Sequence, residues 1–219
     1  MEVKQAIQKR HSVRHFTDQK IDSKQLKEII GIAQKAPSWV NSQPQKVYVA
    51  QGETLKAIRK QQQELTITGA KTNSDIPPMS RKLWSEQAQK NMAEWSHGIP
   101  AVLGDNWQET LGKEASQLYN AQAVVYLTLP KGYTPWSLFD LGAFSQNILL
   151  ATTEQGIDSI VAYNFVKYPQ ILREELKIPD DEEIIVGIGL GFEEEQAQVN
   201  RITSKRMDTE SILKIKNKK

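Results

Sequence analysis

The stretch that most constrains the fold is an apolar run of seven residues, AVVYLTL, at positions 123–129, which ends at Pro130. A short run rich in β-branched and aromatic residues and closed by proline predicts a strand that is buried on both faces. Soon after it, residues 137–155 repeat large apolar side chains at helical spacing and stop at Gly156. A strand without a polar face and a long apolar helix both need cover, so we expect layers packed around a sheet.

Shorter segments of both kinds alternate along the rest of the chain. We expect one domain over residues 1–219, an α+β or α/β sandwich in which helices cover a small sheet. A helical excursion occupies about residues 53–118, and an extended C-terminal arm about residues 193–219. The further helices are expected at residues 2–9, 24–35, 53–64, 81–95 and 169–177, and the further strands at residues 46–50, 159–162 and 184–192.

Composition excludes several classes of chemistry. The chain has 219 residues and no cysteine, which rules out disulfides, thiolate nucleophiles and cysteine-bound metals. The net charge is +2, so no overall field attracts nucleic acid. The N-terminal residues lack the apolar core of a signal peptide, and no apolar run is long enough to cross a bilayer. We therefore expect a soluble, cytoplasmic protein with no nucleic-acid or membrane partner.

The familiar catalytic arrangements are missing from the sequence. Its three histidines are not spaced as metal ligands, so we expect no metal site. There is no Walker A motif and no G-x-S-x-G elbow. A dinucleotide loop is an alternative for the glycine run GIGLG at 187–191, but the three glutamates at 193–195 would repel a phosphate. We expect these glycines to permit close packing between sheet and helix, and we expect no side chain to act as the catalyst.

The stretch RHSVRHF at residues 10–16 carries two arginines and a hydroxyl at alternating positions. In a helix Arg10 and Arg14 share one face, and in an extended chain Arg10, Ser12 and Arg14 point the same way. Either geometry suits a phosphate monoester or a carboxylate through charge-assisted hydrogen bonds. A solvated basic turn is the alternative.

A second polar segment, PSWVNSQP, occupies residues 37–44. The amides of Asn41 and Gln43 can donate and accept, which matches a heterocycle edge with alternating N–H and C=O groups. A flavin mononucleotide (FMN) combines such an edge with a phosphate, and it carries the electron chemistry itself. Ordinary loop capping is the alternative role of these amides.

Six short motifs occur in an order that indicates one family. They are R-x-S-x-R-x-F at 10–16, A-P-S-x-x-N-S-Q-P at 36–44, DLG at 140–142, QNILLA at 146–151, QGI at 155–157 and GLGF at 189–192. With this ordered set, the sequence resembles the FMN-dependent nitroreductase family over nearly its whole length. The resemblance implies a central, mostly antiparallel sheet covered by helices, and a homodimeric oxidoreductase with FMN at the subunit interface.

The resemblance also implies a role for each matching residue. Arg10 and Ser12 would hold the phosphate and ribityl end, Arg14 would lie near the pyrimidine carbonyl and favour the reduced flavin, and residues 161–164 would place a backbone N–H against flavin N5. Pro37, Ser38, Asn41 and Gln43 would come from the partner subunit. The whole set of implied cofactor-binding residues is Arg10, His11, Ser12, Arg14, Pro37, Ser38, Asn41, Gln43, Gln146, Val161, Ala162, Tyr163, Asn164, Lys205 and Arg206.

The sequence departs from the family pattern at a few positions. Gln45 stands where an aromatic residue is common, and Lys205 stands one residue closer to Arg206 than usual. Tyr163 and Asn164 replace what is often an acidic or a glycine pair, which leaves this segment only a backbone role. The residues of the excursion at 53–118 have no counterparts that can be matched.

The implied reaction is a ping-pong transfer. NADH or NADPH would reduce the flavin and leave, and a nitroaromatic compound, a quinone or a similar acceptor would then enter the same pocket. One alternative is a specialised enzyme on the same fold, such as a dehalogenase, a flavin-cleaving oxygenase or an azoline dehydrogenase. The others are a flavin-binding redox sensor without turnover and an interaction protein without a cofactor.

Overall fold

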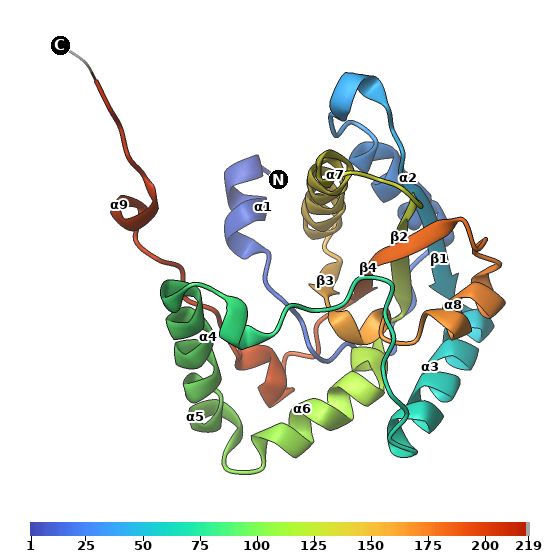
Figure 1. Cartoon of the computed structure of the whole chain (residues 1–219). Coiled ribbons are helices and arrows are strands. Elements are labelled where there is room, and N and C mark those ends of the chain that lie inside the picture. The colour runs from blue at the N-terminus through green and yellow to red at the C-terminus, as the bar shows by residue number, and fades with distance from the viewer. Residues whose placement is uncertain (218–219) are drawn as a thin grey trace.

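The centre of the molecule is a sheet of four antiparallel strands in the order β1-β2-β4-β3 (Figure 1). The computed structural model describes residues 1–217, so the last two residues of the predicted arm lie outside the described part. The predicted antiparallel sheet covered by helices is confirmed. Its strands are β1 (Lys46–Gln51), β2 (Ala123–Pro130), β3 (Asp158–Val161) and β4 (Glu182–Gly191).

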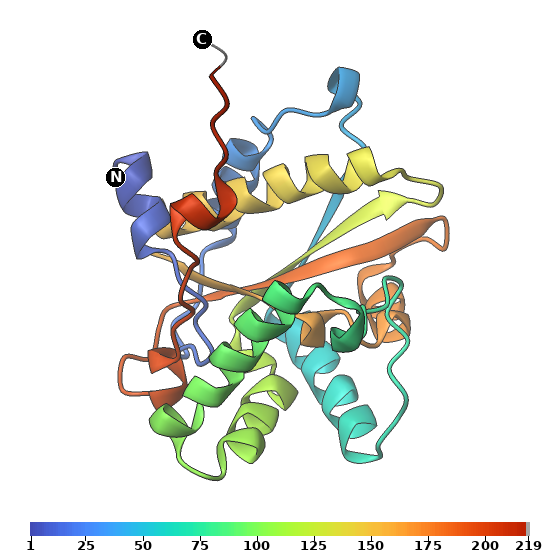
Figure 2. The ribbon, with the colours of Figure 1, turned by 60° about the vertical axis from the view of Figure 1, so that its left-hand side comes forward.

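Helices cover both faces of the sheet, with α2 (Ser23–Ala33) and α7 (Pro135–Glu154) on one side and α3 (Gly52–Ile67) and α8 (Pro169–Leu176) on the other. Figure 2 shows α7 crossing above the strands and α3 lying below them. Alternate side chains of β2 pack into the two helical layers on opposite faces of the sheet. Val125 packs with α2 and α7, whereas Tyr126 packs with α3 and α8, and both are fully buried. This two-sided burial explains why the β2 run lacks a polar face.

The glycines of β4 accommodate aromatic rings. A Cβ at Gly189 would lie 2.5 Å from Cζ of Phe165, and a Cβ at Gly191 would lie 2.6 Å from Cγ of Phe16. Both rings are fully buried. The predicted close approach is confirmed, but its partners are not covering α-helices. Phe16 ends the RHSVRHF stretch, and Phe165 belongs to the short 3₁₀ helix η4 (Tyr163–Phe165).

The excursion is largely helical, as predicted, but it is divided differently. Instead of one helix at 81–95, a 3₁₀ turn precedes α4, because the hydroxyl of Ser85 caps α4 by accepting from the N–H of Ala88 over 3.4 Å. The apolar periodicity of the sequence does not predict the division of residues 100–120 into separate short helices. The elements after α3 are η2 (Arg81–Leu83), α4 (Glu86–Gly98), α5 (Pro100–Leu103), α6 (Trp107–Ser116) and the 3₁₀ turn η3 (Leu118–Asn120).

Residues 10–16 and residues 193–202 approach each other near β3. Helix α1 (Val3–Lys9) packs against α7, and the stretch after it runs beside β3. The 3₁₀ helix η5 (Gln198–Arg201) returns to the same region after β4, and the arm then leaves the body through α9 (Thr209–Ile212), as Figures 1 and 2 show. The loop before β1 carries the 3₁₀ helix η1 (Trp39–Asn41). No helix within residues 1–217 is long and apolar enough to cross a membrane.

Candidate functional site

The RHSVRHF stretch is extended and lies beside β3. Ser12 forms a parallel bridge with Ser159, and the N–H of Val13 donates to the Ser159 carbonyl over 3.1 Å. Val13 is fully buried, whereas Arg10, Ser12 and Arg14 are partly exposed. The extended alternative is therefore the correct one, and the two arginines and the hydroxyl stand at alternating positions along one strand-like segment.

Backbone carbonyls fix the half-buried guanidinium of Arg14. Its Nη1 donates to the carbonyls of Ser12 and Ile202, each over 3.1 Å, and its Cζ lies 5.9 Å from the ring centre of Trp95 in α4. Burial lowers the pKa of Arg14 from its ordinary value, although a guanidinium still stays charged at neutral pH. No described residue accepts a hydrogen bond from Nε or Nη2. Those two nitrogens remain able to donate to a ligand.

Asn200 in η5 holds the backbone at Arg14. Its Oδ1 accepts from the N–H groups of Arg14 (2.6 Å) and His15 (3.0 Å), and its Nδ2 donates to the carbonyls of His15 (2.9 Å) and Glu194 (3.0 Å). Only 6% of Asn200 is exposed, so these bonds are shielded from water. No motif identifies Asn200 in the sequence, because Arg14 lies 186 positions away along the chain.

Residues 161–164 present backbone donors beside an apolar surface. The exposed fractions of Val161 and Tyr163 are 44% and 38%, and Ala162 is half-buried. The N–H groups of Tyr163 and Asn164 stand at the start of η4, where a helix has no internal acceptor for them. Within residues 1–217 they have no other backbone acceptor. A ligand lying on this segment would find unpaired N–H donors.

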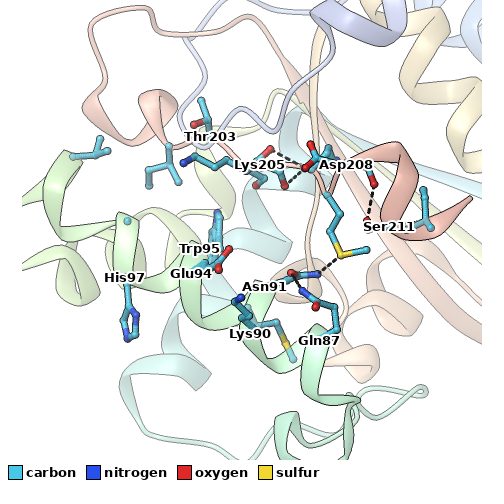
Figure 3. A pocket seen from close by; sticks show the side chains of 18 residues that line it. Gln87, Lys90, Asn91, Glu94, Trp95, His97, Thr203, Lys205, Asp208 and Ser211 are labelled. Carbon is cyan, nitrogen blue, oxygen red and sulfur yellow. Dashed lines mark hydrogen bonds between the residues drawn. The ribbon is translucent and has the colours of Figure 1, made fainter.

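The predicted C-terminal cations line a large cavity. It has a volume of about 1240 Å³ and lies between α4, α5 and the segment at 202–212, with Lys205 and Arg206 in its wall (Figure 3). Nη1 of Arg206 donates to the carbonyl of Ser204 over 2.8 Å. In the described part of the chain, Lys205, Arg206 and Arg10 form no ion pair with a carboxylate. Trp95 lines this cavity and also contacts Arg14, so the cavity adjoins the RHSVRHF stretch.

The loop at residues 37–44 lies at the other end of α7 from the N-terminus. The N–H of Trp39 donates to the carboxylate of Asp140 over 2.8 Å, whereas the N-terminal ammonium pairs with Glu154 at 3.5 Å. At about 1.5 Å per helical residue, these two contacts are roughly 20 Å apart along α7, and Figure 1 shows η1 well away from α1. One chain therefore does not bring the loop to Arg10. The predicted residues in the loop are Pro37, Ser38, Asn41 and Gln43.

Within this loop, the two predicted amides bond to each other. Nε2 of Gln43 donates to Oδ1 of Asn41 over 2.9 Å, so local capping accounts for part of their hydrogen bonding. The backbone is strained, with φ of 43° at Val40, 60° at Asn41 and 45° at Gln43. A β-branched residue at positive φ is rare, and such strain concentrates at functional sites.

Two further predicted residues are placed as follows. His11 is exposed, and its Nε2 lies 3.2 Å from a carboxylate oxygen of Glu193. Gln146 is exposed in the middle of α7. His11 belongs to the extended stretch but points to Glu193, and Gln146 forms no hydrogen bond to that stretch among the described residues.

The donor set fits FMN. A phosphate dianion is bound by charge-assisted hydrogen bonds, and Arg10, Ser12 and Lys205 offer side-chain donors with no acceptor among the described residues. The unpaired N–H groups at the start of η4 fit an acceptor on a ring edge. Within residues 1–217, no group of three or more His, Asp or Glu side chains is placed to hold a metal ion. The kinds of donor present therefore suit an anionic ring cofactor.

The chain is similar to known proteins over most of its length. The sequence model of the nitroreductase family matches residues 7–192. A 4-nitrobenzoate reductase of Pseudomonas putida is 25% identical over 206 residues, which cover 91% of this chain and 89% of that protein. A nitrobenzene nitroreductase of Ectopseudomonas oleovorans is 24% identical, with 94% and 93% of the two chains covered. The crystal structure of the FMN-dependent nitroreductase NfnB from Mycobacterium smegmatis in complex with NADPH has the same fold, with a TM-score of 0.89 at 22% identity over 99% of this chain and 100% of that one.

Proposed function

The chain belongs to the nitroreductase family, and from this we propose that it is an FMN-dependent oxidoreductase that passes electrons from NAD(P)H to nitroaromatic compounds, quinones or similar acceptors. Two of the relatives are named for nitroaromatic substrates, and a structure with the same fold is described with FMN and NADPH. The observation that carries the proposal is the extended stretch from Arg10 to Arg14 beside β3, next to residues 161–164 and joined by the segment after η5.

The chain's own residues would bind and orient the cofactor. Arg10 and Ser12, together with Lys205 and Arg206, would hold the phosphate, because they are donors without a carboxylate partner in the described chain. The N–H groups of Tyr163 and Asn164 would bind the ring edge. When bound, FMN supplies the electron transfer that no side chain here provides.

Arg14 would adjust the reduction potential of the cofactor. Its guanidinium is half-buried and held by the carbonyls of Ser12 and Ile202, so its charge is fixed in place before a ligand arrives. A fixed, partly desolvated charge acts more strongly than one in water. Its Nε and Nη2 would therefore stabilise negative charge on the ring.

We also infer a homodimer in which the loop at 37–44 lines the partner's flavin. Trp39, Trp136 and Phe139 form an exposed aromatic cluster beside this loop, with ring centres 5.2 Å apart for the first pair and 6.2 Å for the second. Their exposed fractions are 57%, 57% and 69%. A cluster of exposed apolar rings is typical of an interaction surface, which supports the proposed dimer. A second copy that covers this cluster would bring its own Asn41 and Gln43 to the flavin site of the first copy. Within one chain these two residues do not reach that site.

We propose a ping-pong order, in which the reductant leaves before the acceptor binds. Val161 and Tyr163 are exposed beside the unpaired backbone donors, and both reactants would use this surface in turn. We propose a cytoplasmic enzyme, and a chain without cysteine is compatible with that reducing compartment.

The test is the visible spectrum of the purified protein, followed by anaerobic NADPH and then 4-nitrobenzoate. We expect a yellow protein that NADPH bleaches and that 4-nitrobenzoate restores. A colourless protein that does not take up added FMN would contradict the cofactor and favour an interaction protein. A yellow protein that NADPH and NADH do not bleach would favour a sensor. A protein that is bleached but not restored by nitroaromatics or quinones would favour a specialised enzyme.

Light scattering across a dilution series tests the dimer. The expected mass is twice that of one chain at every concentration at which FMN stays bound. A monomer that binds one FMN would contradict the shared site.

A further inference from the structure

Three consecutive residues at the end of the excursion have a left-handed backbone. Leu118, Tyr119 and Asn120 have φ of 50°, 59° and 55°, and none of them is a glycine. Left-handed backbone is unfavourable for L-residues and usually occurs at single positions. A run of three therefore persists only where surrounding contacts determine it, and such strain concentrates at functional sites.

The contacts that hold this turn come from the residues after Arg14. The Tyr119 carbonyl accepts from the N–H of Phe16 over 3.0 Å, and Nδ2 of Asn120 donates to the Phe16 carbonyl over 2.8 Å and to the carboxylate of Asp18 over 3.0 Å. The left-handed turn is thus joined directly to the end of the RHSVRHF stretch.

The side chain of Tyr119 reaches Asn164 and Phe165 in η4. The Tyr119 hydroxyl accepts a hydrogen bond from Nδ2 of Asn164 over 3.1 Å, and its ring meets that of Phe165 edge-on at 5.7 Å between centres. Tyr119 is only 7% exposed. Burial raises the pKa of its phenol, while the Asn164 hydrogen bond and the charge of Arg14 oppose that shift.

Tyr119 therefore lies between the two segments that the proposed function places around the flavin. Its turn fixes the end of one segment, and its hydroxyl fixes a side chain of the other. The N–H of Asn164 is one of the two unpaired donors at the start of η4, so the same residue carries both the anchored amide and a backbone donor that would be free to bind the ligand.

We propose that Tyr119 is a positioning residue of the flavin site, which fixes the side chain of Asn164 and thereby the backbone donors of residues 161–164. That the site binds flavin rests on the proposed function. The contact between Tyr119 and Asn164 does not, because both residues belong to the described chain. It also gives the Asn164 side chain a role besides that of its backbone.

The chain provides a matched control in Tyr126. This residue is fully buried in the same core, and its hydroxyl has no hydrogen-bond partner among the described residues. Tyr126→Phe removes the same phenol oxygen as Tyr119→Phe, but it releases no hydrogen-bond partner. Tyr126→Phe therefore controls for the loss of a buried phenol oxygen that no hydrogen-bond partner uses.

The first measurement is amide hydrogen exchange of the peptide that covers residues 161–166, in protein freed of flavin. Losing one net hydrogen bond corresponds to about a two- to tenfold change in a local opening equilibrium. We expect exchange to be faster by that factor in Tyr119→Phe and unchanged in Tyr126→Phe. Equal exchange in Tyr119→Phe and the parent would overturn the proposal.

The second measurement uses the flavin-loaded enzyme. Tyr119→Phe should slow flavin reduction by NADPH two- to tenfold and shift the visible band of the bound flavin, while the KM for the acceptor stays within twofold. In an Asn164→Ala background, Tyr119→Phe should have no further effect, because both changes remove the same contact. Fully additive effects, or a Tyr119→Phe enzyme with parental spectrum and reduction rate, would refute the positioning role. A parent protein that binds no flavin would instead refute the proposed function.

Discussion

Replacing Arg14 by glutamine should lower the midpoint potential of the bound flavin. Glutamine retains a hydrogen-bond donor but removes a positive charge that is held by the carbonyls of Ser12 and Ile202. A charge-assisted hydrogen bond contributes about 1.5–3 kcal/mol. For a two-electron couple, about 1.4 kcal/mol corresponds to about 30 mV, so the expected shift is roughly 30–65 mV. Because Arg14 is partly exposed, we expect the lower end of that range.

Equilibrium titration of the bound flavin against a reference dye measures this shift. Arg14→Lys is the matched control, since it keeps the charge and loses the forked donor, and it should shift the potential by less than half as much as Arg14→Gln. An unchanged potential with a large loss of FMN would mean that Arg14 binds the phosphate. If neither the potential nor the affinity changes, the guanidinium serves only to hold α4 through Trp95.

Four further outcomes follow from named contacts. Asn200→Ala leaves the buried N–H groups at Arg14 without an acceptor and should lower the free energy of unfolding by about 2–4 kcal/mol in urea titrations, with unchanged stability as the contradicting result. Gly189→Ala places a methyl group against the ring of Phe165 and should cost about 1–3 kcal/mol in the same assay, with unchanged stability as the contradicting result. Burial lowers the pKa of Lys167 in the folded protein. Between the folded and unfolded pKa values the unfolded chain binds more protons, so the parent protein gains stability as the pH rises toward about 10.4. Lys167→Met should lack that gain when the unfolding free energies of both proteins are compared at pH 7 and pH 10. Removing FMN should lower the melting temperature, since a ligand at 100 times its Kd stabilises the folded state by about 2.7 kcal/mol, and equal melting curves for loaded and stripped protein would contradict a folded-state site.

The sequence predicted the parts of the fold that depend on local patterns. The run that became β2 and the long helix α7 are recognisable because each is apolar on every side, and both were placed within about two residues of their bounds. The split before α4 was missed, because the apolar spacing at residues 81–95 continues through Ser85 although its hydroxyl caps a new helix. The RHSVRHF stretch fitted a helix and a strand equally well. Only its bridge to Ser159 decides between them.

The parts of the candidate site that sequence reasoning missed depend on contacts between distant segments. Asn200 has no local signature, and its role is defined by Arg14 and His15 at the other end of the chain. The left-handed turn at Tyr119 carries no glycine, so the usual signal for positive φ is missing there. The motifs that were found are those in which the binding groups are close together in sequence.

The exposed face of α7 connects the proposed dimer to the proposed chemistry. A helix that is apolar all round is normally buried on all sides, yet Trp136 and Phe139 are exposed while Phe144 and Ile148 on the same helix are packed in the core. The loop with η1 is fixed to this helix through the bond from Trp39 to Asp140. A second copy that covers the exposed rings would therefore position the loop as well, because loop and rings share one rigid support. In the proposed dimer, burying the aromatic cluster and completing the flavin site would be the same event. The strained loop would then act in the partner's flavin site, because it does not reach Arg10 of its own chain.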